Sequence, residues 1–118
     1  MPVVEISEEG AKSTYNDPAL TKRVMAGIGR WLGEGNLVPK KAVMGAEDFG
    51  LYGRAEPRIP SCIFWLGTIT KESVAESIKT GKTLPSLHSS KFAPVPEPTL
   101  KTGVTAMTAA VLELVGQR

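Results

Sequence analysis

The strongest indication of fold class comes from one short run, Ser61-Cys62-Ile63-Phe64-Trp65-Leu66-Gly67. The run is apolar from position 62 to position 66 and ends at a glycine. A strand in the middle of a sheet has covering layers on both faces, so its residues are apolar on both sides and do not alternate with polar ones. The run therefore predicts a buried strand inside a covered sheet.

Helices are expected on both sides of this strand. Asp17 and Pro18 fit the N-cap and first position of a helix that ends at Gly33. A second helix is expected from Pro98 to Gly116, and a weaker one over residues 71–79. Apolar residues at helical spacing are Leu20, Val24, Ile28, Trp31 and Leu32 in the first helix, and Leu100, Val104, Met107, Val111 and Leu114 in the last. The stripe of the last helix is interpreted as a core face that packs against the sheet.

Two further short strands are expected, in Val3-Val4-Glu5-Ile6 and in Lys41-Ala42-Val43-Met44. Because helices and strands then alternate along the chain, the predicted fold class is α/β. Residues 81–98 form a proline-rich loop, which is too long for a neutral connection in a compact domain. A binding role is expected for this loop.

Length and composition limit the functions to consider. The chain has 118 residues, enough for one domain or part of one, with ordinary apolar (42%) and charged (22%) contents. The net charge of +2 is small, and the basic residues are interspersed with acidic ones, so no nucleic-acid partner is expected.

No apolar run approaches the ~20 residues that span a membrane. Cys62 is the sole cysteine and is read as a small core residue, which fits a reducing, cytoplasmic location.

Three residues are candidates for a functional site. His88 is the only histidine and lies in Leu84-Pro85-Ser86-Leu87-His88-Ser89-Ser90. Glu47 and Asp48 lie in the glycine-flanked turn Met44-Gly45-Ala46-Glu47-Asp48-Phe49-Gly50. Imidazole is a suitable ligand for zinc, manganese or nickel, and carboxylates can line a metal site or orient its ligands. The alternative for the two acids is capping of a following helix. One histidine alone cannot build a metal site, which needs several ligands.

Four segments, in this order, resemble the C-terminal part of a family of metallo-amidohydrolases. The family includes hippurate hydrolase, N-acyl-amino-acid amidohydrolases and plant auxin-conjugate hydrolases. The matching segments are Tyr15-Asn16-Asp17-Pro18, Met44-Gly45-Ala46-Glu47-Asp48-Phe49, Phe64-Trp65-Leu66-Gly67, and Leu87-His88-Ser89 with Phe92 and the helix from Leu100. Each motif alone is weak, and four in order are fairly specific.

The resemblance implies an incomplete, zinc-peptidase-like catalytic domain with three layers, α/β/α. Residues 1–12 would be the last strand and exit of a lid (dimerisation) domain, and residues 13–118 the C-terminal portion of the catalytic domain. Enzymes of this family hold two divalent metals (zinc, manganese or nickel) and hydrolyse the amide bond of an N-acyl amino acid. The resemblance makes His88 a metal ligand, with Glu47 and Asp48 lining the site or supporting its ligands.

The departures from the family pattern concern the catalytic machinery. The chain has no Cys-x-His motif, and its Glu8-Glu9 pair lies in the wrong place to match the family's ligand and general base. The catalytic residues are therefore expected in a missing N-terminal half, and this chain alone is expected to be inactive. Association with that half would restore hydrolysis. Two alternatives are a non-catalytic interaction domain that self-associates through an exposed sheet edge, and a small metalloenzyme combining His88, Glu47, Asp48 and Asp17.

Overall fold

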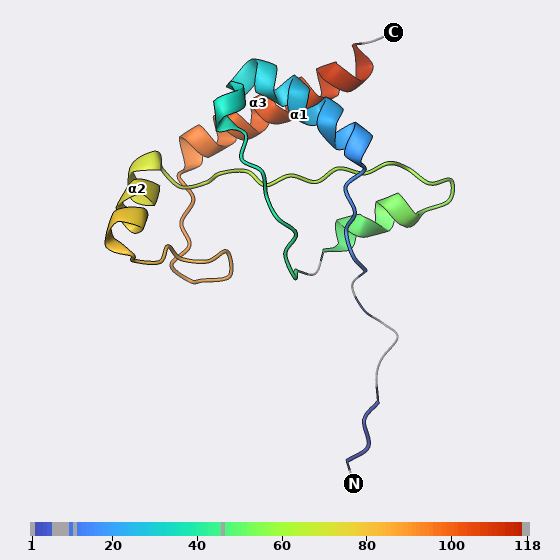
Figure 1. Cartoon of the computed structure of the whole chain (residues 1–118), viewed down its shortest axis with the longest axis horizontal. Helices are drawn as coiled ribbons and strands as arrows, with labels where there is room; N and C mark the ends of the chain where they lie inside the picture. The colour runs from blue at the N-terminus through green and yellow to red at the C-terminus, as the bar shows by residue number, and fades with distance from the viewer. Residues whose placement is uncertain (1, 6–9, 11, 46, 117–118) are drawn as a thin grey trace.

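Two long helices cross each other and form the centre of the structure, a computed structural model that describes residues 2–5, 10, 12–45 and 47–116 (Figure 1). A third helix lies to one side, and long irregular segments connect the helices. The helical elements are α1 (Pro18–Leu32), η1 (Glu34–Asn36), η2 (Asp48–Arg54), α2 (Lys71–Thr80) and α3 (Pro96–Val115), where η denotes a 3-10 helix.

The first helix begins and ends where its sequence predicts. Asp17 is the N-cap of α1, and its Oδ1 accepts a hydrogen bond from the Leu20 backbone N–H at 2.8 Å. Pro18 occupies the first helical position, where the missing N–H costs nothing. Gly33 ends the helix with a φ of +84°, a conformation that side chains other than glycine's rarely adopt. These three residues confirm the predicted bounds of the helix.

The other two helices are also confirmed, with small shifts at their ends. Thr70 caps α2 by accepting a hydrogen bond from the Ser73 backbone N–H at 3.2 Å, and Gly81 ends it in the left-handed region at φ +70°. α3 begins at Pro96, two residues before the predicted start, and Gly116 is its C-cap as predicted.

The core lies where α1 meets α3. The buried apolar residues in the described part of the chain are Val24, Ile28, Ala106, Ala109 and Ala110. α3 presents mainly alanines to α1, so the two helix backbones approach closely. Because its side chains are small, this core is thin.

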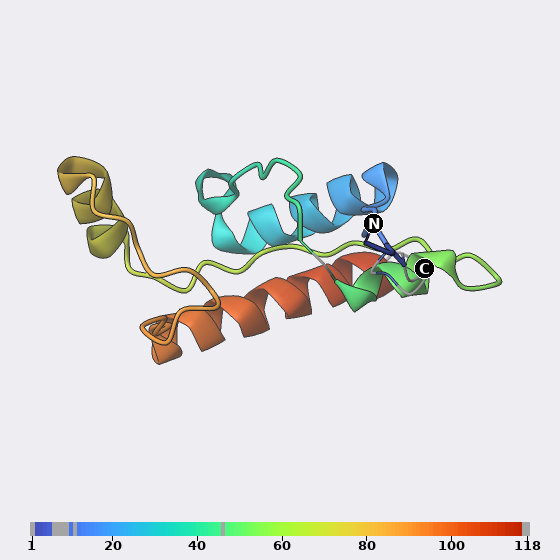
Figure 2. The same cartoon turned by 90° about the horizontal axis from the view of Figure 1, so that it is seen from below.

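The run at residues 61–67 is extended and lies along the helix pair, passing between α1 and α3 in the view of Figure 2. Cys62 and Phe64 pack against the α1–α3 core, whereas the alternate residues Ile63 and Trp65 are exposed. The Asn16 side chain holds the run in place: its amide donates to the Ile63 carbonyl at 2.7 Å and accepts from the Ile63 N–H at 2.8 Å. One side-chain amide thus supplies the pair of bonds that a neighbouring strand would make.

The predicted α/β fold class, an incomplete three-layer α/β/α domain, is wrong for this structure. Half of the structure is helical, and no strand or sheet occurs in the residues described. The run at 61–67 has the extended backbone of a strand, but only Asn16 bonds to the backbone of residues 62–67 among the described residues. Residues 3–5 and 41–44 likewise form no strand, and Ile6 lies outside the described residues.

Many residues predicted for the core are exposed. The stripe Leu100, Val104, Met107, Val111 and Leu114 lies on the surface of α3, and Trp31 of α1 is also exposed. The solvent-accessible surface of the chain is 10,266 Å². A compact monomer of its mass has an accessible surface of roughly 6,200 Å². Its Cα radius of gyration is 17.9 Å, against about 13 Å for a compact domain of this length. The apolar surface is therefore far from fully buried.

No helix in the part of the chain that the structure describes combines the length and apolar character needed to cross a membrane.

Candidate functional site

His88 lies exposed in a turn of the loop that joins α2 to α3. The turn is held by its own backbone: the Ser89 N–H donates to the Ser86 carbonyl at 2.9 Å, and the Phe92 N–H donates to the Ser89 carbonyl at 3.0 Å. The Ser89 Oγ also accepts from the Lys91 N–H at 3.1 Å. The turn thus presents the imidazole to solvent, where a ligand can reach it.

Glu47 and Asp48 are also exposed, at the start of η2. The Glu47 Oε1 accepts a hydrogen bond from the Phe49 backbone N–H at 3.1 Å, so Glu47 is the N-cap of this short helix. The capping alternative therefore describes the contact that Glu47 makes. Asp48 is the first residue of η2, and no hydrogen bond to its side chain occurs among the described residues.

The structure does not assemble these residues into a metal centre. Across residues 2–5, 10, 12–45 and 47–116, no three His, Cys, Asp or Glu side chains are close enough together to hold a metal ion. The Asp17 carboxylate caps α1 instead of joining such a group. The loop that carries His88 and the η2 segment both lie on the side of the 61–67 run that faces away from α1 (Figure 1). They are two separate segments on that side. The small metalloenzyme alternative therefore has no support in this geometry.

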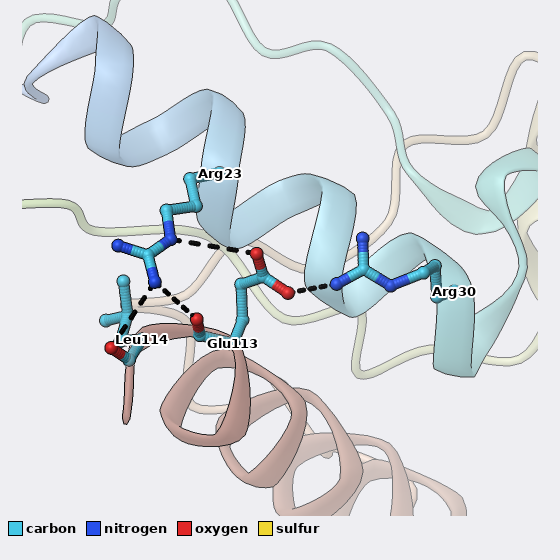
Figure 3. A network of polar contacts seen from close by, with 4 residues as sticks. All are labelled: Arg23, Arg30, Glu113 and Leu114. Atoms are coloured by element: carbon cyan, nitrogen blue, oxygen red, sulfur yellow. Dashed lines mark hydrogen bonds and ion pairs between the residues drawn. The ribbon is translucent and has the colours of Figure 1, made fainter. Parts of the chain in front are cut away.

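A mostly buried carboxylate that the sequence did not single out connects the two long helices. The Glu113 side chain is only 10% exposed and lies between Arg23 and Arg30 of α1 (Figure 3). Its Oε1 is 3.7 Å from Arg23 Nε, and its Oε2 bonds to an Nη of Arg30. Arg23 also donates to the Glu113 carbonyl at 2.6 Å and to the Leu114 carbonyl at 3.3 Å, near the C-terminus of α3 where carbonyls lack helical partners. This network is structural, because its groups are engaged with one another.

A surface cavity of about 440 Å³ lies beside the N-terminus of α1. The Arg54 guanidinium on its wall donates to the Ser13 carbonyl at 3.2 Å and to the Ser13 Oγ at 3.0 Å. Arg58 adds a second positive charge and the Asp17 carboxylate adds a negative one, so charges of both signs line the cavity. It is lined by Ser13, Tyr15, Asp17, Gly50, Gly53, Arg54, Arg58, Ile59, Pro60 and Ser61. None of the three predicted site residues lines it.

Cys62 is half-buried and packs against the α1–α3 core. This placement agrees with its interpretation as a small core residue.

Comparison with known proteins adds no relative: no protein-family model, no curated protein and no solved structure matches this chain.

Proposed function

We propose that this chain is the C-terminal portion of a metal-dependent amidohydrolase that cleaves N-acyl amino acids such as hippurate. In this proposal a further polypeptide segment supplies the remaining metal ligands and the general base, and the chain alone is inactive. The proposal rests on the four family-like segments, which occur in the family's order. A cytoplasmic location belongs to the same proposal.

One observation supports the need for a further segment more than any other. The chain exposes 10,266 Å², which is roughly 4,000 Å² more than a compact monomer of this mass would expose. Large hydrophobic residues contribute to this exposed surface, and Val38, Met44 and Trp65 are among them. Monomeric soluble proteins rarely expose contiguous apolar patches above a few hundred Å², and larger patches mark interaction sites.

In this proposal His88 contributes one metal ligand from its exposed turn, and Glu47 and Asp48 line the site. A divalent zinc, manganese or nickel ion would supply a water activated to a pKa of about 7 and a polarised substrate carbonyl. The described residues of this chain do not fit such an ion by themselves. Further ligands from another segment are therefore required.

Hippurate hydrolysis by the native gene product that contains this chain tests the proposal. The expected result is a native mass well above 12.6 kDa and turnover that needs added Zn²⁺, Mn²⁺ or Ni²⁺. His88→Ala should abolish turnover, whereas Ser90→Ala, an exposed change in the same turn, should retain it. A native product of 118 residues without turnover would reject the proposal, as would full activity of His88→Ala.

The exposed apolar surface also favours a second candidate function, that of a non-catalytic interaction domain. The sheet edge expected for such a domain does not form in the described residues, so the contact surface would be helical or would use the extended 61–67 run. Binding of a dye specific for apolar surface, measured alongside light scattering, tests this candidate. A monomer that binds no dye would exclude it.

A further inference from the structure

The two faces of α3 differ sharply in the size of their side chains. The face against α1 consists of small residues, with Ala106, Ala109 and Ala110 buried. Among the described residues, α1 is the helix that packs against α3, and it lies on one side of α3 only (Figure 2). The large side chains on the opposite face are between 39% and 67% exposed. This second face is called the α3 seam and consists of Leu100, Val104, Met107, Val111 and Leu114.

The α3 seam has the spacing of a coiled coil. Its residues follow one another at intervals of four, three, four and three, so they alternate between positions d and a of a heptad repeat. Both a positions, 104 and 111, are valine, and the d positions are leucine or methionine. In parallel coiled coils, β-branched residues at a with leucine at d favour two strands, and each side chain fits a hole in the facing helix.

We infer that two copies of this chain associate through the α3 seam as a parallel, two-fold symmetric helix pair. A two-fold interface is self-complementary, so a continuous apolar stripe on one copy meets the same stripe on the other. The inference rests on the second candidate function, the interaction domain, and specifies that its partner is a second copy of the chain and its surface the α3 seam. It does not depend on the proposed hydrolysis.

This pairing is favoured because the seam is uncharged and because α3 is already a folded helix before association. The seam itself carries no charged residue, and the flanking Lys101 is already paired with Glu97 of the same helix at 2.7 Å. Burying the exposed parts of the seam and its immediate neighbours on both copies removes on the order of 1,000 Å² from water, the size at which specific interfaces begin. α3 is held against α1 before association, so pairing does not incur the cost of nucleating a helix.

Sedimentation analysis of the chain from low micromolar to hundreds of micromolar concentration tests the inference. A reversible monomer–dimer equilibrium is expected. The double variant Val104→Lys/Val111→Lys should weaken the dimer at least 100-fold, because two charges per helix would be buried. Both valines are exposed in the monomer, so its helical circular dichroism should be unchanged. Ile78→Lys on α2, a matched change at a position that is 79% exposed, should leave the dimer intact.

A wild-type chain that stays monomeric would overturn the inference. So would a dimer that persists in the double variant, or one that Ile78→Lys weakens equally. If the double variant loses its helical signal, Val104→Asn replaces it, since asparagine at a single a position keeps a helix pair while lowering its stability. A dimer of unchanged affinity in Val104→Asn would then count against the seam.

A cross-link decides the orientation of the pair. In a Cys62→Ser background, Val104→Cys places two thiols opposite each other in a parallel pair, within the Cα separation of about 4.4–6.8 Å that a disulfide needs. Rapid oxidation to a covalent dimer is expected. In an antiparallel pair position 104 faces a different position of the partner helix, so a non-covalent dimer that does not cross-link at 104 would contradict the parallel arrangement.

Discussion

Gly27 of α1 lies so close to Glu113 of α3 that a β-carbon on Gly27 would stand 2.9 Å from the Glu113 Cβ. No real side chain tolerates this separation without movement, so the glycine permits the closest approach of the two helices. The same approach brings the Glu113 carboxylate between Arg23 and Arg30 (Figure 3). Close helix packing and the ion network around Glu113 therefore depend on each other.

Gly27→Ala should destabilise the chain although alanine is the better helix former. Alanine gains about 1 kcal/mol of helix propensity, but the clash with Glu113 forces the helices apart, at a cost of about 1–3 kcal/mol for overpacking. Because the displacement also stretches the contacts of Glu113 with both arginines, we expect a net loss of stability in urea unfolding.

Gly29→Ala is the matched control in the same helix. Its β-carbon would meet Leu37 Cδ1 at 3.1 Å and Glu34 Cγ at 3.3 Å, which are atoms of side chains that can move. We expect this variant to be neutral or slightly more stable than the wild type. Equal effects of the two substitutions would contradict the assigned role of Gly27.

Glu113→Ala should cost about 1–3 kcal/mol, since it removes the hydrogen bond from Arg30 and the ion pair with Arg23 at a mostly buried carboxylate. The bonds from Arg23 to the Glu113 and Leu114 backbone carbonyls remain in this variant. Raising the salt concentration from 0.05 M to 1 M should narrow the difference from the wild type, because both arginines are partly exposed to screening ions. Thermal and urea unfolding at the two salt concentrations measure this. As a comparison, Glu97→Ala breaks an exposed pair with Lys101 and should cost less than about 0.5 kcal/mol.

Asn16→Ala should loosen the middle of the extended run at residues 61–67, while the bond from the Asp17 N–H to the Ser61 carbonyl at 2.9 Å still holds its first residue to the start of α1. Both hydrogen bonds to Ile63 disappear, at a cost of about 1 kcal/mol each. We expect faster amide exchange at Ile63, while the amides in the middle of α1 stay protected. Asn36→Ala removes one bond to the Leu32 carbonyl and should leave exchange at Ile63 unchanged. Slow exchange at Ile63 in Asn16→Ala would show that the Asn16 bonds are not needed, and that the packing of Cys62 and Phe64 together with the Asp17–Ser61 bond holds the run.

The helices could be predicted from the sequence because their signals are local. Asp17, Pro18 and Gly33 act within one turn of their own position, and their capping roles do not depend on the rest of the fold. Thr70 and Gly81 bound α2 for the same reason.

The strands could not be predicted in this way, because a strand exists only where a neighbour pairs with it. Residues 61–67 have the apolar pattern of a buried strand and an extended backbone, but one asparagine side chain takes the place of a neighbour. The α3 stripe was assigned to the core by its period alone. The helical spacing of apolar residues shows that they share one face, but it does not show what covers that face. In the structure, α1 packs on the alanine face of α3 instead.

For the candidate site, the sequence identified residue types but not their separation in space. The sequence suggested capping as one role for Glu47, and the structure has it as the N-cap of η2. The role of Glu113 was missed because it depends on two arginines about 90 residues away in the chain. Contacts between such distant positions leave no local pattern in a single sequence.

The metal content of the native gene product, measured by mass spectrometry after dialysis, tests most directly whether His88 belongs to a metal centre completed by another segment. We predict that the wild type retains zinc, manganese or nickel and that His88→Ala loses at least nine-tenths of it, whereas Ser90→Ala keeps it. Retention of the same metal by His88→Ala, or a wild type that holds none, would contradict the account.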